Sequence, residues 1–176
     1  MDVIETSTLR LEPQLTAHAE EMFAVLSDPA IYEYENEPPP SVEWLRARFA
    51  RLESRRSTDG KEQWLNWVIR LPTSELIGYV QASVREDGRA AIAYELAHPY
   101  WGRGLGTEAV RAMIGALVEC YQVRTCSAVF KRENQRSRRV LEKLDFKLAS
   151  PAEHANRQIE AGELLMELTI PGQPAD

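Results

Sequence analysis

The part of this sequence best suited to chemistry is a glycine-rich run from Trp101 to Thr107, which carries a glycine at every second position. It follows an expected strand over 90–97 and opens an amphipathic helix. Glycines let the backbone turn sharply and approach a ligand closely. The first amides of a helix have no intrahelical partner, and with the helix dipole they form a site for an anion such as a pyrophosphate. The run therefore predicts a phosphate-binding turn to which Arg103 adds charge; a plain connection with tightly packed glycines is the alternative.

Two familiar phosphate motifs do not fit this run. A P-loop places a lysine directly before its serine or threonine, whereas Gly106 precedes Thr107 here. A dinucleotide fingerprint needs a glycine three positions after Gly104, where Thr107 stands, and it does not follow a hairpin meander. The run is therefore neither of these motifs.

A second feature opens the next expected helix, over 134–144. Asn134 is a natural N-cap, and Ser137 lies one turn later on roughly the same face. Simple capping, with a polar serine at the rim, is the plain interpretation. The two features in this order are more specific together than either is alone.

The elements that position these features predict a mixed α/β sheet. Amphipathic helices are expected after Thr16 and Ser41, each a natural N-cap. Asp87-Gly88 predicts a hairpin turn, because a tight turn needs residues that tolerate positive φ. The expected strands cover 8–12, 64–71, 76–84, 90–97, 123–130, 146–149 and 163–170. Helices, then a meander, then a β-α-β-α-β run indicate a single α/β (α+β) domain over 1–170, followed by a loose tail over 171–176.

In this arrangement the sequence resembles the GNAT superfamily of acyl-CoA N-acyltransferases. In that family a strand leads into a Gln/Arg-x-x-Gly-x-Gly/Ala turn that opens a helix and cradles the CoA pyrophosphate. Trp101 stands where glutamine or arginine is usual, which is a departure from the general motif. The resemblance implies a GNAT-like fold of about seven mainly antiparallel strands, with a central splayed parallel pair, flanked by about four helices.

The resemblance extends to the RimJ/RimL branch, the ribosomal-protein N-terminal acetyltransferases and their relatives. Tyr-Trp-Gly-x-Gly followed by Thr-Glu-Ala is similar to that branch, as is the stretch from Asn134 through Ser137 and Arg139 to Phe146. The opening Thr8–Pro13 is similar as well. Members of the branch acetylate protein N-termini, polyamines, antibiotics and small amines, so the resemblance leaves the acceptor open.

Acetyl-CoA is the cosubstrate that the resemblance implies, and no metal is expected. It assigns cofactor binding to the end of the preceding strand, the glycine run and the start of the next helix. These residues are Leu96, Ala97, Trp101, Gly102, Arg103, Gly104, Leu105, Gly106, Thr107, Asn134, Ser137 and Arg139. Arg139 belongs to a basic cluster around Asn134 that is suited to the 3′-phosphate and adenine end of CoA.

The implied reaction is attack of a neutral amine on a thioester carbonyl, which gains from a base and from a proton donor to the thiolate. The resemblance makes Ser137 the candidate donor; a hydrogen bond to the cofactor is the alternative. Glu95 is the first candidate base, because it lies near the end of a strand just before the glycine run. Strand alternation places it opposite Ile92, Tyr94 and Leu96. A structural ion-pair partner is the alternative role for Glu95, and the other candidate bases are Glu33, Glu35 and Glu37.

We expect the acceptor site in the loop between the first two helices, where this fold commonly builds it. Tyr32, Glu33, Glu35 and Glu37 lie there before three prolines, and such rings and carboxylates can attract a cationic amine. A solvated acidic loop is the alternative. Trp67 is a candidate pocket wall, although core packing is the more frequent fate of such residues.

Composition sets the remaining bounds. The net charge of −6 argues against nucleic acid as a partner. Two cysteines are too few for a disulfide framework. No apolar run approaches the roughly 20 residues of a membrane span, and the N-terminus lacks a signal-peptide pattern. We expect a cytoplasmic N-acetyltransferase without a membrane partner; homodimer formation stays open. The alternative function is a non-catalytic acyl-CoA-binding sensor or regulatory module.

Overall fold

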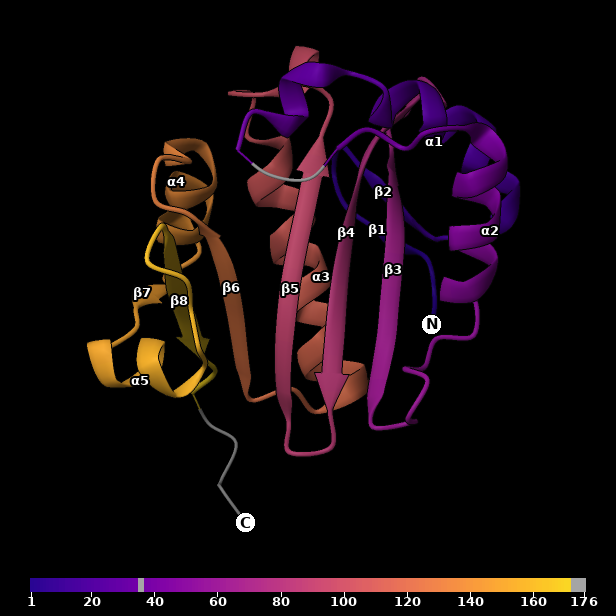
Figure 1. Ribbon diagram of the computed structural model, residues 1–176. Coiled ribbons are helices and arrows are strands. Elements are labelled where there is room, and N and C mark those ends of the chain that lie inside the picture. Colours follow the sequence, from indigo (N-terminus) through magenta and orange to yellow (C-terminus); the bar gives the residue numbers. More distant parts are fainter. Residues whose placement is uncertain (35–36, 172–176) are drawn as a thin grey trace.

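A mixed sheet is the frame of the molecule in the computed structural model, which describes residues 1–34 and 37–171 (Figure 1). In these residues eight strands lie in the order β1-β2-β3-β4-β5-β6-β8-β7. Neighbouring strands are antiparallel except for β5 and β6, which are parallel. The strands are β1 (Ile4–Glu5), β2 (Arg10–Pro13), β3 (Glu62–Arg70), β4 (Leu76–Arg85), β5 (Arg89–Leu96), β6 (Thr125–Lys131), β7 (Lys147–Leu148) and β8 (Glu163–Thr169).

Helices cover both faces of the sheet, and α3 runs behind its central strands (Figure 1). The helices are α1 (Ala19–Leu26), α2 (Val42–Leu52), α3 (Leu105–Tyr121), α4 (Gln135–Lys143) and α5 (Pro151–Asn156), with short 3-10 turns η1 (Thr16–His18), η2 (Pro29–Tyr32) and η3 (His98–Tyr100). Val68 packs with α1 and α2, whereas its neighbours Trp67 and Ile69 pack in the core that contains α3 and α4. Because successive strand residues point to opposite faces, β3 contributes to both cores.

Two of the three predicted N-cap residues start a helix in the structure. The Ser41 hydroxyl accepts the Trp44 N–H at 3.1 Å and starts α2 as predicted. The Asn134 side chain does the same for α4. The Thr16 prediction is wrong: α1 begins only at Ala19, and the Thr16 hydroxyl donates instead to the Glu53 carboxylate on the neighbouring segment.

The hairpin and the parallel pair are confirmed. Gly88 has φ +76° in the turn between β4 and β5, and its N–H donates to the Arg85 carbonyl at 3.1 Å. β5 and β6 pair only where Arg89–Ala91 face Thr125–Ser127, although both strands continue beyond these residues. The two strands therefore separate toward the end of β5, and this splay decides where the site forms.

Two details differ from expectation. The two-residue strand β1 raises the strand number to eight, and α5 is an additional helix. Ser150 and Glu153 cap α5 through a reciprocal capping box.

Glu35 of the expected acceptor loop and positions 172–176 of the expected tail lie outside the described residues. Within the described ranges, no helix combines the length and the apolarity that a bilayer crossing requires.

Candidate active site

A cavity of about 380 Å³ lies at the end of β5, where that strand leads into the glycine turn. Its walls come from the end of β5 with this turn, from the start of α4, and from the segment around Ile31 and Tyr34. The separation of β5 from β6 beyond Ala91 brings these segments around one space. The predicted site residues in its lining are Glu95, Leu96, Trp101, Gly102, Gly104, Gly106, Thr107, Asn134, Ser137 and Arg139.

The glycine turn has the backbone that an anion site needs. Gly102 and Gly104 have φ +72° and +85°, which L side chains rarely adopt, and a Cβ on either would meet no atom within 4 Å. Backbone conformation, and not lack of space, therefore requires these glycines. The Gly104 carbonyl accepts the Glu108 N–H at 3.0 Å, which leaves the preceding amides of α3 without an intrahelical acceptor. Gly106 and Thr107, which carry two of these amides, line the cavity, so the start of α3 fits a pyrophosphate.

Basic side chains surround the turn. Arg139 and Lys143 line the cavity itself. Gly104 and Thr107 also border a second hollow, whose lining includes Arg103, Arg111 and Lys143. The charge around the turn is therefore suited to a ligand with several phosphate groups.

Trp101 has a structural explanation for its departure from the usual motif. Its indole N–H donates to the Leu96 carbonyl at 2.7 Å, so the ring ties the end of β5 to the start of the turn. Its ring also packs against both hydrophobic cores. The Trp101 side chain thus fixes the turn by packing and by one hydrogen bond, where the usual motif has a polar or charged side chain.

Ser137 lies in the first turn of α4 and faces Tyr94 of β5. Asn134 caps the helix by accepting the Ser137 N–H at 3.0 Å. The Tyr94 hydroxyl lies 2.9 Å from Ser137 Oγ and 3.0 Å from the Ser137 carbonyl oxygen. Burial raises the pKa of Tyr94 well above its ordinary value, and the hydrogen bond with Ser137 opposes this only in part. The phenol is therefore neutral at physiological pH and acts as a hydrogen-bonding group.

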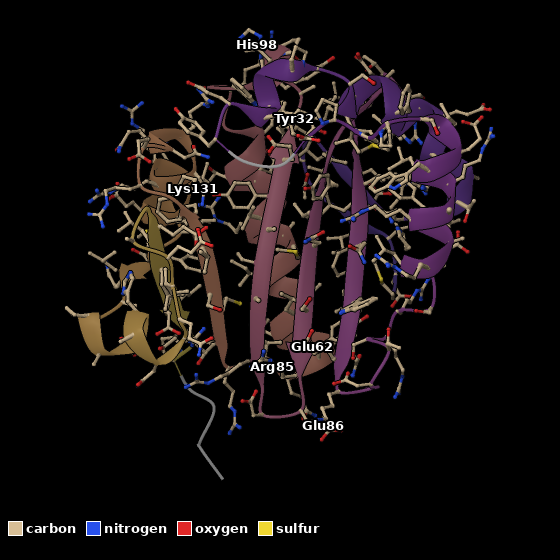
Figure 2. The ribbon with its side chains drawn as sticks, in the orientation of Figure 1. Tyr32, Glu62, Arg85, Glu86, His98 and Lys131 are labelled. Carbon is tan, nitrogen blue, oxygen red and sulfur yellow. The ribbon has the colours of Figure 1, made fainter. Side chains whose placement is uncertain are left out.

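Glu95 lies on the face of β5 opposite the core that contains α3, and it borders the same cavity. One of its carboxylate oxygens accepts the Leu96 N–H at 3.2 Å. Burial, and then the nearby Glu95 charge, raise the pKa of Tyr32 to about 12. The Tyr32 hydroxyl donates to the Leu26 carbonyl at 2.8 Å, and Figure 2 places this tyrosine at the end of β5 nearest the turn. Glu95 and Ser137, the two predicted catalytic residues, thus border one cavity.

The loop in which we expected the acceptor site is arranged differently from a row of free carboxylates. Glu33 accepts a hydrogen bond from Arg136 of α4 at 2.8 Å, and this bond holds the pKa of the Glu33 carboxyl below its ordinary value. The Arg136 guanidinium also lies 4.0 Å from the Trp101 ring centroid and 5.5 Å from that of Tyr34. Glu37 is exposed. Neither Glu33 nor Glu37 lines the cavity, so the loop meets it through Ile31 and Tyr34 instead.

Comparison with known proteins agrees with this geometry. The family model of the acetyltransferase (GNAT) domain matches residues 8–147. The chain belongs to the GNAT family. It is therefore an acetyl-CoA-dependent acyltransferase domain. It is 26% identical to an uncharacterized N-acetyltransferase, p20, of Bacillus licheniformis over 83% of each chain.

Two solved GNAT structures illustrate the shared fold. RimL, a ribosomal L7/L12 alpha-N-protein acetyltransferase in complex with coenzyme A, superposes with a TM-score of 0.79 at 17% identity, over 97% of this chain and 99% of RimL. The ribosomal-protein-S5-alanine acetyltransferase of Vibrio fischeri gives 0.79 at 16% identity, over 98% and 99%. At these identities the likeness concerns the GNAT fold.

Some residues predicted for this GNAT site do not border the cavity. Trp67 is 1% exposed, and its indole N–H donates to the Asp2 carbonyl at 3.0 Å inside the α3 core. The expectation that Trp67 walls the acceptor pocket is therefore corrected. Ala97 is held against β4 by its N–H, which donates to the Ile77 carbonyl at 2.9 Å. Leu105 and Tyr32 flank the lining without being part of it.

Val140 and Lys143 are lining residues that sequence reasoning missed. Together with Arg136 and Arg139, both part of the basic cluster expected around Asn134, they line the cavity, and their spacing of three, four and seven from Arg136 is that of one helix face. This signal could have extended the site from Arg139 alone. Tyr94 offered no such signal, because strand alternation pointed it toward the core. In the part of the chain that the structure describes, no group of three or more histidine, cysteine, aspartate or glutamate side chains is placed to hold a metal ion.

Proposed function

We propose that this protein transfers the acetyl group of acetyl-CoA to a primary amine by direct attack within a ternary complex. The observation that carries the proposal is that one cavity is bordered by the glycine turn, by Glu95 and by Ser137. A cosubstrate held by its phosphates at the turn and extended along the splay would present its thioester between these two side chains. Acetyl-CoA supplies an activated carbonyl there when it is bound.

The cofactor is held, in this proposal, by the residues around the turn. The amides that follow Gly104 bind the pyrophosphate, as the positive φ of the turn and the open space beside it favour. Arg139 and Lys143 face the same space, and Arg103 and Arg111 add charge in the neighbouring hollow. These side chains bind the phosphate groups at the adenosine end.

Glu95 is the proposed base that removes the proton from the amine, directly or through a water. A lysine-type amine at pH 7 is neutral at a cost of about 4–5 kcal/mol, whereas an α-amino group costs only about 1 kcal/mol. Relief of this cost by a carboxylate at the cavity wall is the advantage of having Glu95 there. The same arithmetic favours an acceptor of low pKa, such as a chain terminus.

Ser137 is the proposed donor to the leaving sulfur, and Tyr94 decides where its hydrogen points. The neutral phenol has one hydrogen for two acceptors, Ser137 Oγ at 2.9 Å and the Ser137 carbonyl oxygen at 3.0 Å. When the phenol donates to the carbonyl, the 2.9 Å contact is a hydrogen bond only if the serine hydroxyl donates to the phenol oxygen, which turns its hydrogen away from the sulfur. When the phenol donates to Oγ, the serine hydrogen is free for the sulfur. Tyr94 is therefore a positioning residue for the proposed acid.

A protein or peptide N-terminus heads our set of acceptors, with small-molecule amines as the other class. The support is the shared fold with RimL and with the S5-alanine acetyltransferase, together with the RimJ/RimL-like motifs of the glycine turn and of α4. We propose a cytoplasmic location for the reaction, as we expect from the apolar runs and the N-terminal residues of the sequence.

The test is a screen for release of free thiol from acetyl-CoA across peptides, polyamines, amino acids and aminoglycosides, with mass spectrometry of the product. We expect acetylation of at least one amine, and loss of it in Ser137→Ala together with Glu95→Gln. Protection by acetyl-CoA against thermal unfolding, without thiol release with any amine, would instead identify a binding module.

A further inference from the structure

Arg136 joins three segments that the chain keeps far apart. Its guanidinium stacks on Trp101 of the glycine turn at 4.0 Å and approaches the Tyr34 ring at 5.5 Å, both within the range of a cation–π contact. One of its nitrogens lies 2.8 Å from Glu33 Oε2. The side chain starts from the first turn of α4, between the Asn134 cap and Ser137.

The stacking carries more of this contact than the ion pair does. The Arg136 and Glu33 side chains are 42% and 53% exposed, and an exposed pair of this kind contributes little by itself. A planar guanidinium over the Trp101 ring and near the Tyr34 ring is more specific, because aromatic contacts of this kind constrain orientation as well as distance. Trp101 is in turn fixed by its hydrogen bond to the Leu96 carbonyl. A continuous set of contacts therefore runs from β5 through the turn to the segment at residues 29–34.

We infer that Arg136 is a positioning residue that sets the acceptor-side wall of the cavity against its cofactor-side wall. Ile31 and Tyr34 form the first wall, and Trp101 with the glycine turn forms the second. The Glu33 charge is then compensated by Arg136, so Glu33 holds that arginine and is not a free carboxylate for an amine. The inference deepens the proposed function, since the kinetic part of its test assumes acetyl transfer.

The first test does not depend on acetyl-transfer activity. Hydrogen exchange of the segment at residues 29–34, followed by mass spectrometry, reports whether this segment stays docked. Its amides are defined: the Ala30 N–H donates to Asp28 Oδ1 at 2.9 Å and the Ile31 N–H to the Asp28 carbonyl at 3.3 Å. In Arg136→Ala we expect hydrogen exchange of this segment to accelerate about fivefold or more, because the variant loses the cation–π contact that holds the segment in place.

Arg138 provides the matched control. It lies two residues further along α4, is 45% exposed, and pairs with Glu142 at 2.8 Å without lining the cavity. Arg138→Ala should leave exchange at 29–34 unchanged. Equal exchange in wild type and Arg136→Ala, or equal acceleration in both variants, would overturn the inference even if no acceptor were found.

The second test separates positioning from cofactor contact by kinetics with any accepted amine. Arg136→Ala should raise the acceptor KM about fivefold to tenfold and change the acetyl-CoA Kd less than about twofold. Arg136→Lys, which keeps the charge but not the planar group, should recover only part of this loss. Glu33→Gln should act in the same direction more weakly, and the double variant Arg136→Ala/Glu33→Gln should be no worse than Arg136→Ala. A rise confined to the acetyl-CoA Kd would make Arg136 a cofactor contact and refute the inference.

Discussion

Replacement of Gly104 by aspartate and by asparagine separates the charge at the glycine turn from its backbone. Gly104 lies at φ +85° and ψ −13° directly before α3 and is exposed. An added side chain would meet no atom within 4 Å, so neither variant creates a clash. An L residue in this conformation costs about 1–2 kcal/mol, less for these two residues. That cost corresponds to a fall in Tm of only a few degrees, about 2–4 °C per kcal/mol.

The two variants should differ sharply in acetyl-CoA binding. A carboxylate about 5 Å from one phosphate charge costs about 3 kcal/mol at an effective dielectric constant of about 20, the value suited to an exposed site. This energy corresponds to a loss of affinity of more than about 100-fold. Asparagine has the same shape without the charge, so Gly104→Asn isolates the steric part. In the absence of cofactor, the aspartate should melt no lower than the asparagine, because a negative charge is favourable at a helix N-terminus.

Calorimetric titration with acetyl-CoA, and thermal unfolding with and without it, measure these effects. We expect Gly104→Asn to keep most of the cofactor-induced rise in Tm and Gly104→Asp to lose it. An acetyl-CoA affinity of Gly104→Asp within about threefold of that of Gly104→Asn would refute the assignment of the pyrophosphate to this turn.

Three further predictions concern proton transfer and stability. Ser137→Ala should lower kcat more than it raises the KM for acetyl-CoA, and Tyr94→Phe should lower kcat about threefold to tenfold in the wild type but little in Ser137→Ala; additive effects would separate the two hydroxyls. Glu95→Gln should lower the rate and remove the acidic limb of the pH–rate profile, and an unchanged limb would move the base elsewhere. Burial of Glu108 favours its neutral form, but hydrogen bonds from Thr6 and Thr8 outweigh this and hold its pKa below 4.5. Because the folded pKa is depressed, this stabilisation is present above the unfolded pKa and lost as pH falls through the folded one. Glu108→Gln should therefore reduce the free energy of unfolding by about 1–2 kcal/mol at pH 7, a difference that urea titrations should find narrowing as the pH falls through the folded pKa; an equal deficit at neutral and at acid pH would contradict this.

Local sequence determined the elements whose signals are local. The Asp87-Gly88 turn, the Ser41 and Asn134 caps and the glycine run all act within a few residues of their own position, and each lies where the pattern predicts. The capping box of α5 at Ser150 is of the same kind and was readable, although it was not predicted. Thr16 shows the limit of such signals, since its hydroxyl is drawn to Glu53 by a contact between segments.

The composition of the cavity was decided by tertiary structure. Alternation along β5 correctly separates Glu95 from Tyr94, yet both reach the cavity because the strand leaves β6 beyond Ala91. A splay of two strands depends on how far their pairing extends, which no single strand encodes.

The acceptor side shows the same division. Sequence placed aromatic and acidic residues in the loop before α2 but could not give their partners. In the folded chain Arg136, which is distant in sequence, forms an ion pair with Glu33 and a cation–π contact with Trp101. The sequence by itself thus determined the family, the glycine turn proposed to bind the cofactor, and the candidate catalytic pair. Only the tertiary structure decided which loop side chains line the cavity, because that depends on contacts between segments about 100 residues apart, such as the one between Glu33 and Arg136.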